Sequence, residues 1–157
     1  MFDLKGNERI VKRSEKIEDK RVFKSTTDAL ADVREFVNEL ALRFGFGDKE
    51  VSEITLAVDE ACTNVIKHAY KGRPDAEFEV KILATGTAFQ IVVRDWGASF
   101  RPEEVPLPNI RDKYRKHKAG GLGIFLMKKL MDTVEYKGRD ASNEVRLVRY
   151  LKNEQKS

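Results

Sequence analysis

The sequence predicts an α+β fold, a two-layer sandwich in which helices cover one face of a mixed, mostly antiparallel sheet. Three segments carry apolar residues at helical spacing, and two pairs of segments alternate apolar and polar residues as strands do. With 157 residues, the chain is long enough for one domain that buries about 70% of the surface of its unfolded chain.

The helices are expected at residues 28–44, 52–70 and 121–132. Thr27 or Asp28 caps the first helix, and the glycines of GFGD at 45–48 break its apolar spacing. The second helix carries a single apolar stripe, made of Ile54, Val58, Ala61, Cys62, Val65 and Ala69. The third helix follows a cluster of glycines.

The strands are expected in three places along the chain. A short strand at 21–25 precedes the first helix, and residues 76–84 and 88–95 form a hairpin around Thr85, Gly86 and Thr87. Residues 133–138 and 143–152 form a second antiparallel pair. The polar residues 1–20 read as a flexible leader, so the domain is expected to span residues 21–152.

Composition excludes several classes of protein. No apolar run reaches the roughly 20 residues of a membrane-spanning helix, and the amino terminus lacks the apolar core of a secretory signal, so a cytoplasmic protein is expected. Cys62 lies in the apolar stripe and is read as a packed thiol, and one Cys with two His gives no zinc-site spacing. The net charge of +4 is interspersed with acidic residues, so direct nucleic-acid binding is not expected.

Glu60, Asn64 and His68 stand four residues apart along one edge of the apolar stripe of the second helix. This column lies at the border between the core and a cavity, where a carboxylate and an amide can meet a ligand. The amide oxygen of Asn64 is a suitable Mg²⁺ ligand when phosphates and waters complete the octahedron. A solvated helix flank is the competing interpretation.

Two further motifs follow. Asp95-x-Gly97 lies where a buried strand leaves the sheet, so that its carboxylate can accept a hydrogen bond from an exocyclic amine. The segment Gly120-Gly121-Leu122-Gly123 opens a helix, where backbone N–H groups and the helix dipole favour an anion. Each motif alone also fits an ordinary turn or helix entry.

Together, DEACTNVIKHAYK, DWGASF and GGLGIFLMKKLMD resemble the nucleotide-binding motifs of the GHKL superfamily of ATPases and kinases. The resemblance covers residues 21–151 and is strongest to the bacterial anti-sigma factors that are serine-protein kinases. It implies the sandwich called the Bergerat fold, with ATP and Mg²⁺ as ligands.

The resemblance also implies roles for individual residues. Asn64 corresponds to the magnesium ligand, Asp95 to the carboxylate that reads adenine, and Gly97 to the glycine beneath the adenine ring. Glu60 corresponds to the general base that accepts the proton of a substrate serine. The remaining nucleotide-binding positions are Lys118, Gly120, Gly121, Leu122 and Gly123. His68 is expected to have a structural role, and Asp59 points about 100° away from Glu60.

Residues 100–119 correspond to a lid over ATP, in which Lys118 is the first choice for a phosphate contact and Arg111 and Arg115 are alternatives. The sequence departs from the family at Ser99, where many members have glycine. It also departs where many members have a threonine that supports the adenine carboxylate, because that place reads SNEV, with Asn143 or Glu144 nearest.

The leading functional interpretation is an ATP-dependent serine/threonine kinase that is also an anti-sigma factor. The resemblance implies that it binds a sigma factor, phosphorylates a STAS-type anti-anti-sigma protein on serine, and forms a homodimer. One alternative is an ATP-binding regulatory module that exchanges partners without phosphoryl transfer. Another is a histidine-kinase catalytic domain, which the absence of a phosphoacceptor helical hairpin disfavours.

Overall fold

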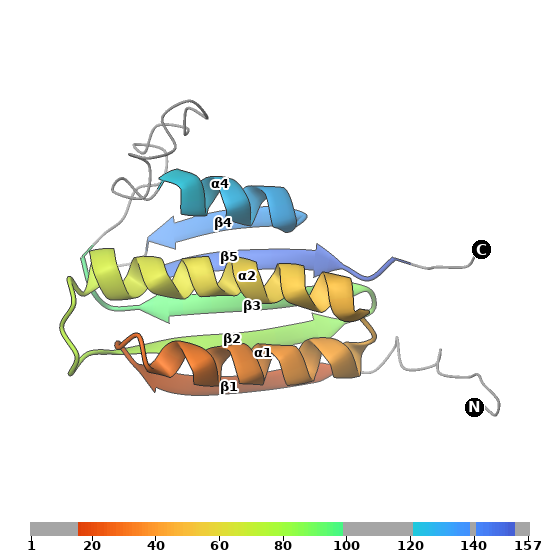
Figure 1. Cartoon of the computed structure of the whole chain (residues 1–157), viewed down its shortest axis with the longest axis horizontal. Coiled ribbons are helices and arrows are strands. Elements are labelled where there is room, and N and C mark those ends of the chain that lie inside the picture. The colour runs from red at the N-terminus through yellow and green to blue at the C-terminus, as the bar shows by residue number, and fades with distance from the viewer. Residues whose placement is uncertain (1–15, 99–120, 139–140, 153–157) are drawn as a thin grey trace.

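A five-stranded sheet forms one layer of the molecule, and the described helices pack on one face of it (Figure 1). The computed structural model describes residues 16–98, 121–138 and 141–152. In chain order the elements are β1 (Ile17–Lys24), α1 (Ala29–Phe44), α2 (Asp48–Asn64), the π-helix η2 (Val65–Ala69), β2 (Glu77–Thr85), β3 (Ala88–Asp95), α4 (Gly121–Leu130), β4 (Thr133–Gly138) and β5 (Asn143–Tyr150).

The strand order is β1-β2-β3-β5-β4, and each of these neighbouring pairs is antiparallel. The two-layer α+β prediction is therefore confirmed, although no parallel pair occurs among the described strands. Because β3 lies at the centre of the sheet and β5 beside it, the end of β3 is enclosed by neighbours on both sides. This placement puts Asp95, the last residue of β3, inside the molecule.

The core lies between the sheet and the helices. Alternating residues of β2 and β3 face it, and the stripe predicted for the second helix is buried throughout. Phenylalanines from both layers meet there, with the rings of Phe44 and Phe89 at a centroid separation of 5.6 Å. Cys62 is fully buried in this core, which confirms a packed thiol.

Most element boundaries agree with the sequence to within a few residues, and two differ. The first strand begins at Ile17, four residues before the expected start of the domain. The second helix begins at Asp48, directly after the glycine break, and it changes to a π-helix after Asn64. The turn between β2 and β3 is as predicted, with Gly86 at φ +62°.

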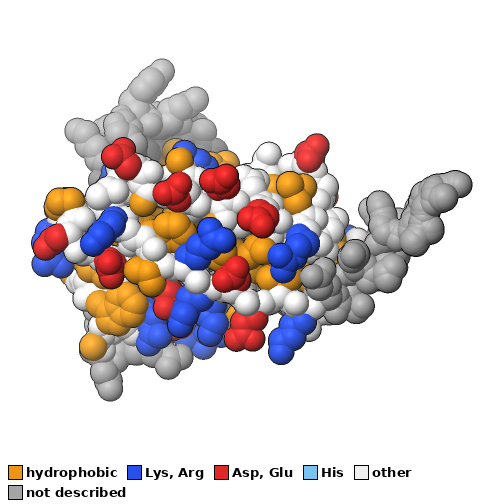
Figure 2. Space-filling view, turned by 90° about the horizontal axis from the view of Figure 1, so that it is seen from below, with side chains coloured by type: hydrophobic (Ala, Val, Ile, Leu, Met, Phe, Trp, Pro, Cys, Tyr) orange, Lys and Arg blue, Asp and Glu red, His pale blue; other side chains and the backbone are white. Residues whose placement is uncertain are grey.

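The surface carries both signs of charge. Seen from the edge formed by β1 and α1, Lys and Arg side chains are interspersed with Asp and Glu (Figure 2). Some charged residues form ion pairs between neighbouring strands, such as Lys20 on β1 with Glu79 on β2 at 3.6 Å. None of the described helices is long and apolar enough to cross a membrane.

Candidate functional site

Asp95 is a carboxylate held at the buried end of β3. Its side chain is turned toward the helices, and the residue is 6% exposed. The Oδ1 atom accepts two hydrogen bonds of 2.9 Å, from the backbone N–H of Gly97 and from Nδ2 of Asn143. Burial raises the pKa of Asp95, and these two hydrogen bonds oppose the rise. Within the described part of the chain, Oδ2 receives no hydrogen bond, so it is the oxygen left for a ligand.

Asn143 is the residue that supports this carboxylate. It is the first residue of β5 and lies opposite Asp95 in the β3–β5 register. Its Nδ2 donates to Asp95 Oδ1 at 2.9 Å and to the carbonyl oxygens of Gly97 at 3.2 Å and Ala98 at 3.4 Å. Glu144 faces the other side of the sheet, where its carboxylate lies 3.6 Å from Arg94. Of the two candidates for the threonine position, the structure therefore selects Asn143.

Gly97 lies directly against the backbone of η2. A Cβ atom at this position would overlap the carbonyl oxygen of Ala69 and come within 2.9 Å of Cδ1 of Tyr70. The N–H of Ala98 donates to Ala69 O at 2.9 Å, so the loop after β3 is bonded to the π-helix. Glycine is required at position 97 because two backbone segments meet there. Whether an adenine ring also lies on this glycine stays a prediction.

Tyr70 holds the same loop through hydrogen bonds. The sequence alone did not identify this tyrosine as part of the site. Its hydroxyl accepts a 2.8 Å hydrogen bond from the N–H of Trp96 and donates a 2.6 Å hydrogen bond to the carbonyl of Glu77. The tyrosine is buried at the end of η2. No local pattern marks it, because its partners come from β2 and from the loop after β3. The π-helix and this loop are thus joined as one unit.

Asn64 ends α2, immediately before η2. Its Nδ2 atom is buried and has no hydrogen-bond partner among the described residues. A buried amide without a partner costs free energy unless water or a ligand satisfies it. A side-chain amide offers N–H donors on one atom and an acceptor oxygen on the other, which suits a place where a phosphate oxygen and a cation lie together, so Asn64 fits the magnesium role. Within the described ranges, no three His, Cys, Asp or Glu side chains gather as metal ligands.

Glu60 lies one turn before Asn64 and contacts the start of α4. A Cβ atom on Gly123 would come within 2.5 Å of Oε1 of Glu60. The carboxylate is half-buried, and burial, followed by the charge of Asp59, raises its pKa, while Lys67 lowers it. A carboxylate whose pKa is raised toward neutrality is suited to accept a proton.

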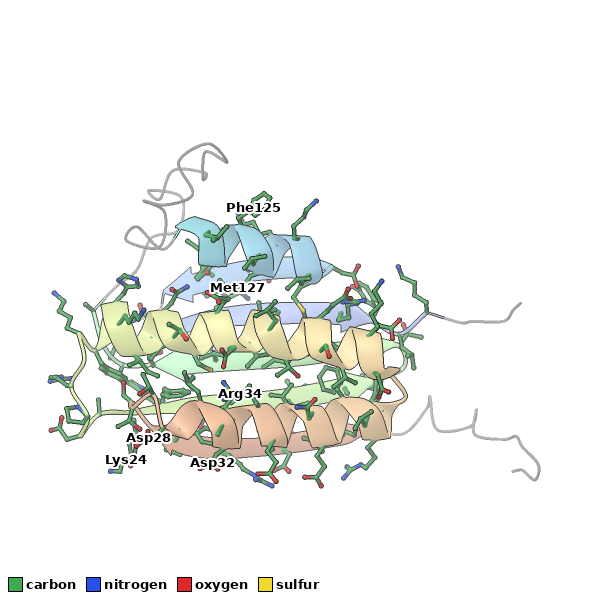
Figure 3. The ribbon with its side chains drawn as sticks, viewed as in Figure 1. Lys24, Asp28, Asp32, Arg34, Phe125 and Met127 are labelled. Carbon is green, nitrogen blue, oxygen red and sulfur yellow. The ribbon has the colours of Figure 1, made fainter. Side chains whose placement is uncertain are left out.

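Asp59, adjacent to Glu60 in sequence, points elsewhere, as predicted. Its Oδ1 forms a 2.8 Å ion pair with Arg34, which lies on the side of α1 that faces α2 (Figure 3). The pair is partly exposed and links the two helices. Asp59 therefore has a structural partner and influences Glu60 only through its charge.

Helix α4 begins at Gly121, as the glycine motif predicts, and packs beside α2. Met127 points into the interface between these helices and is fully buried, whereas Phe125 points away from the sheet (Figure 3). Leu122 is exposed. At the other end of α4, the carbonyl of Leu130 accepts a 2.8 Å hydrogen bond from Arg149. The packing of Met127 and this bond fix the helix, and with it the position of its first turn.

Part of the predicted site lies outside the described residues. This part comprises the proposed lid at 100–119 with Arg111, Arg115 and Lys118, together with Gly120 and Ser99. His68 is half-buried on η2. Because η2 is a π-helix, His68 does not continue the four-residue column of Glu60 and Asn64 in α-helical geometry.

The described residues can provide three functions in one region. Asp95 offers a buried acceptor, the Asn64 amide offers a donor and an acceptor, and Glu60 offers a proton acceptor beside the first turn of α4. Helix α4 begins with glycines, and its first turn lies against Glu60, so its N-terminal N–H groups are near this region. An adenine-type base, a phosphate chain and a hydroxyl nucleophile are the ligands that suit these groups.

Comparison with known families agrees with this chemistry. Residues 23–149 match the family described as the histidine kinase-like ATPase domain. This match covers every described helix and the sheet except for most of β1 and the last residue of β5.

Individual relatives are similar over much of the chain. It is 33% identical over 128 residues to the serine-protein kinase RsbW of Bacillus pumilus, covering 78% of each protein. It is 36% identical over 100 residues to the serine-protein kinase RsbW of Listeria monocytogenes, covering 61% of this chain and 64% of that one. The match to the Bacillus subtilis protein of the same name is 29% identical over 126 residues and covers 78% of each.

The fold is also found among solved structures. The crystal structure of the RsbU and RsbW domains of Rv1364c from Mycobacterium tuberculosis superposes with a TM-score of 0.63. The overlap covers 86% of this chain and 32% of that chain, at 15% sequence identity. At this level of identity the likeness concerns the arrangement of helices and strands.

Proposed function

The chain belongs to the histidine kinase-like ATPase family and, within it, to the serine-protein kinases RsbW, and from this premise we propose that it transfers the γ-phosphoryl group of ATP to a serine of a partner protein. The observation that carries the proposal is the position of Glu60, whose carboxylate lies against Gly123 at the first turn of α4. A proton acceptor placed beside a site suited to phosphates has a direct use in phosphoryl transfer.

Asp95 and Asn64 would bind the nucleotide at two separate points. Oδ2 of Asp95 would accept a hydrogen bond from the exocyclic amine of adenine, because Oδ1 is already bonded twice. The Asn64 amide would meet the phosphates and a magnesium ion, which neutralises phosphate charge when bound. The glycines at the start of α4, with Lys118, Gly120 and Leu122, are the proposed phosphate-side contacts.

Glu60 would act on the second substrate, a serine hydroxyl. In the transfer, a bond forms between the serine oxygen and the γ-phosphorus, and the bond from that phosphorus to the bridging oxygen of ADP breaks. The hydroxyl proton passes to the Glu60 carboxylate. Burial and the charge of Asp59 make this carboxylate a better proton acceptor than an exposed glutamate.

The proposed partners follow from the resemblance to anti-sigma kinases. The substrate would be a STAS-type anti-anti-sigma protein, and the kinase would bind a sigma factor when that antagonist is phosphorylated. The active form would be a homodimer, working in the cytoplasm, where ATP and sigma factors are found. A regulatory module without transfer remains the alternative, and Glu60 is the residue that argues against it.

Two measurements test the proposal. Magnesium and ADP at about 100 times the dissociation constant should stabilise the protein by about 2.7 kcal/mol, a melting shift on the order of 5–10 °C. Asn64→Ala should lose that shift. Transfer of labelled phosphate to a STAS protein should fall by roughly 10²–10⁴ in Glu60→Gln, while the ADP shift is kept. A Glu60→Gln protein that phosphorylates at the wild-type rate would remove Glu60 from the base role.

A further inference from the structure

The loop that follows β3, residues 95–98, is held by hydrogen bonds on two sides. On one side, Tyr70 Oη accepts from the Trp96 N–H, and Ala69 O accepts from the Ala98 N–H. On the other side, a single amide group, that of Asn143, contacts Asp95 Oδ1 and the carbonyls of Gly97 and Ala98. The loop is therefore held in one conformation before any ligand binds.

The orientation of the Asn143 amide follows from its neighbours. The three atoms near Nδ2 are all oxygens that accept hydrogen bonds, at 2.9, 3.2 and 3.4 Å. The opposite orientation would place an amide oxygen against these three acceptors and would lose every bond. Nδ2 carries two protons, and with three acceptors in range both are used inside the loop.

Because both Nδ2 protons of Asn143 are bonded inside the loop, this side chain has no donor left for a ligand. We propose that Asn143 is a positioning residue for nucleobase selection. It fixes Asp95 with Oδ2 as the remaining acceptor, keeps no donor for the ring nitrogen of the base, and so makes the exocyclic amine the group that the site reads. The inference rests on the proposed nucleotide binding and deepens it.

The physical basis is the direction of Asp95. A carboxylate whose Oδ1 is fixed by two donors cannot rotate Oδ2 away from the ligand without breaking one of them. A base with a carbonyl in place of the amine would set an acceptor against this acceptor. Its neighbouring ring nitrogen then carries a proton, but the base would have to shift to bring that proton to Oδ2, and a buried unpaired carboxylate oxygen is costly. Sites of this kind reject the wrong hydrogen-bonding group strongly.

Three nucleotides test whether the protein recognises the exocyclic amine of the base or the neighbouring ring nitrogen. Calorimetry with the full chain and magnesium would compare ADP, IDP, which has a carbonyl for the amine and a proton on the neighbouring ring nitrogen, and 1-deaza-ADP, which lacks that nitrogen. We expect 1-deaza-ADP to bind within about threefold of ADP, and IDP to bind at least about 30-fold more weakly. Binding of 1-deaza-ADP that is as weak as that of IDP would show that the ring nitrogen is read, and would overturn the proposal.

Variants at position 143 test the residue itself. Asn143→Ala should weaken ADP by about tenfold or more and should reduce the preference for ADP over IDP, because Asp95 is free to turn. Asn143→Ser, which keeps one hydroxyl donor, should recover part of that preference. The matched control is Glu144→Gln on the opposite face of the sheet, which should bind all three nucleotides as the wild type does.

Amide hydrogen exchange in the ligand-free protein gives a readout that does not depend on nucleotide. In Asn143→Ala the Gly97 N–H should exchange about tenfold faster, because its acceptor Asp95 Oδ1 loses its second donor. The Trp96 N–H, bonded to Tyr70, serves as the internal control and should change much less. Unchanged exchange and unchanged ADP-to-IDP preference in Asn143→Ala would refute the role of Asn143 while nucleotide binding stands. A wild-type protein that binds none of the three would refute both.

Discussion

The first turn of α4 meets the side chain of Glu60 at Gly123, and a Cβ atom there would come within 2.5 Å of Oε1. The absence of a side chain at position 123 is what allows the carboxylate to occupy this place. Since Oε1 is the far end of a flexible side chain, a methyl group would move the carboxylate before it moved either helix. Gly123 and Glu60 therefore form one unit for positioning the proton acceptor.

Gly123→Ala should accordingly slow phosphoryl transfer without lowering the stability of the fold. Alanine is favoured over glycine in a helix by about 0.5–1 kcal/mol, so the melting temperature should stay the same or rise. Phosphoryl transfer should fall by roughly 10²-fold, because displacing a catalytic group by about 1 Å has an effect of that size. The check is the transfer rate measured beside ADP affinity.

The double variant Glu60→Gln with Gly123→Ala provides the control for this prediction. If Gly123 acts through Glu60, the double variant should be no slower than Glu60→Gln alone. Independent, multiplying losses would mean that Gly123 serves the phosphates and not the carboxylate.

The acid limb of the pH–rate profile, where the transfer rate falls at low pH, should reflect the protonation of Glu60. The base works in its ionised form, so transfer falls as pH drops through its pKa, which burial and Asp59 raise above the ordinary glutamate value. Asp59→Asn removes a negative charge and should move the limb to lower pH. Lys67→Gln removes a positive charge and should move it to higher pH.

The measurement for this prediction is kcat/KM for transfer against pH in the wild type and both variants. Ionisations of ATP and of the partner protein are common to all three, so the shift between profiles is the informative quantity. Glu135→Gln, on β4, is the control variant and should leave the limb in place. Shifts of Asp59→Asn and Lys67→Gln in the same direction would contradict the assignment.

Substitution of Asp95 by asparagine should abolish nucleotide binding without lowering the stability of the fold at neutral pH. Its folded-state pKa is raised by burial, so folding favours the protonated form, and the free energy of unfolding decreases as pH rises from the unfolded-state pKa through the folded-state pKa. At a pH above the folded-state pKa this loss is complete. Asp95→Asn removes the buried charge, and its amide oxygen can still accept from Gly97 and Asn143.

Ligand-free Asp95→Asn should therefore be at least as stable as the wild type at pH 7 by urea unfolding, and its advantage should shrink below about pH 4. The same variant should lose ADP binding, because an amide N–H would face the exocyclic amine. A variant that is less stable at pH 7 than at acid pH, relative to wild type, would show that the carboxylate stabilises the fold.

The sequence predicted the framework because most of its signals are local. The alternation of apolar residues placed β3 at 88–95 and β4 at 133–138, and the structure has the same bounds. The stripe of α2 also proved to be buried throughout. The π-helix was not predicted, because a constant α-helical spacing was assumed through Ala69. No particular residue type indicates that one turn of a helix contains an extra residue.

The site was harder to predict where partners come from distant strands. Asn143 and Glu144 were both candidates. The choice depended on which of them shares a face with Val145 and Leu147, two buried residues of β5. The β3–β5 register then sets Asn143 opposite Asp95. Local residue spacing does not predict the register between strands that are distant in sequence. Tyr70 had no signal at all, since its bonds join segments that are remote in sequence.

The contact between Gly97 and η2 leads to the last prediction. A Cβ atom at position 97 would overlap the carbonyl oxygen of Ala69, and backbone cannot yield as a side-chain end does. Gly97→Ala should therefore destabilise the protein by about 1–3 kcal/mol and push the loop away from η2, with loss of ADP binding. Gly138→Ala is the matched control, because a Cβ atom there has no neighbour within 4 Å among the described residues, and its stability should change by less than about 0.5 kcal/mol. Urea unfolding and the ADP melting shift measure both effects, and a Gly97→Ala protein as stable as Gly138→Ala would show that the loop can move away from the π-helix freely.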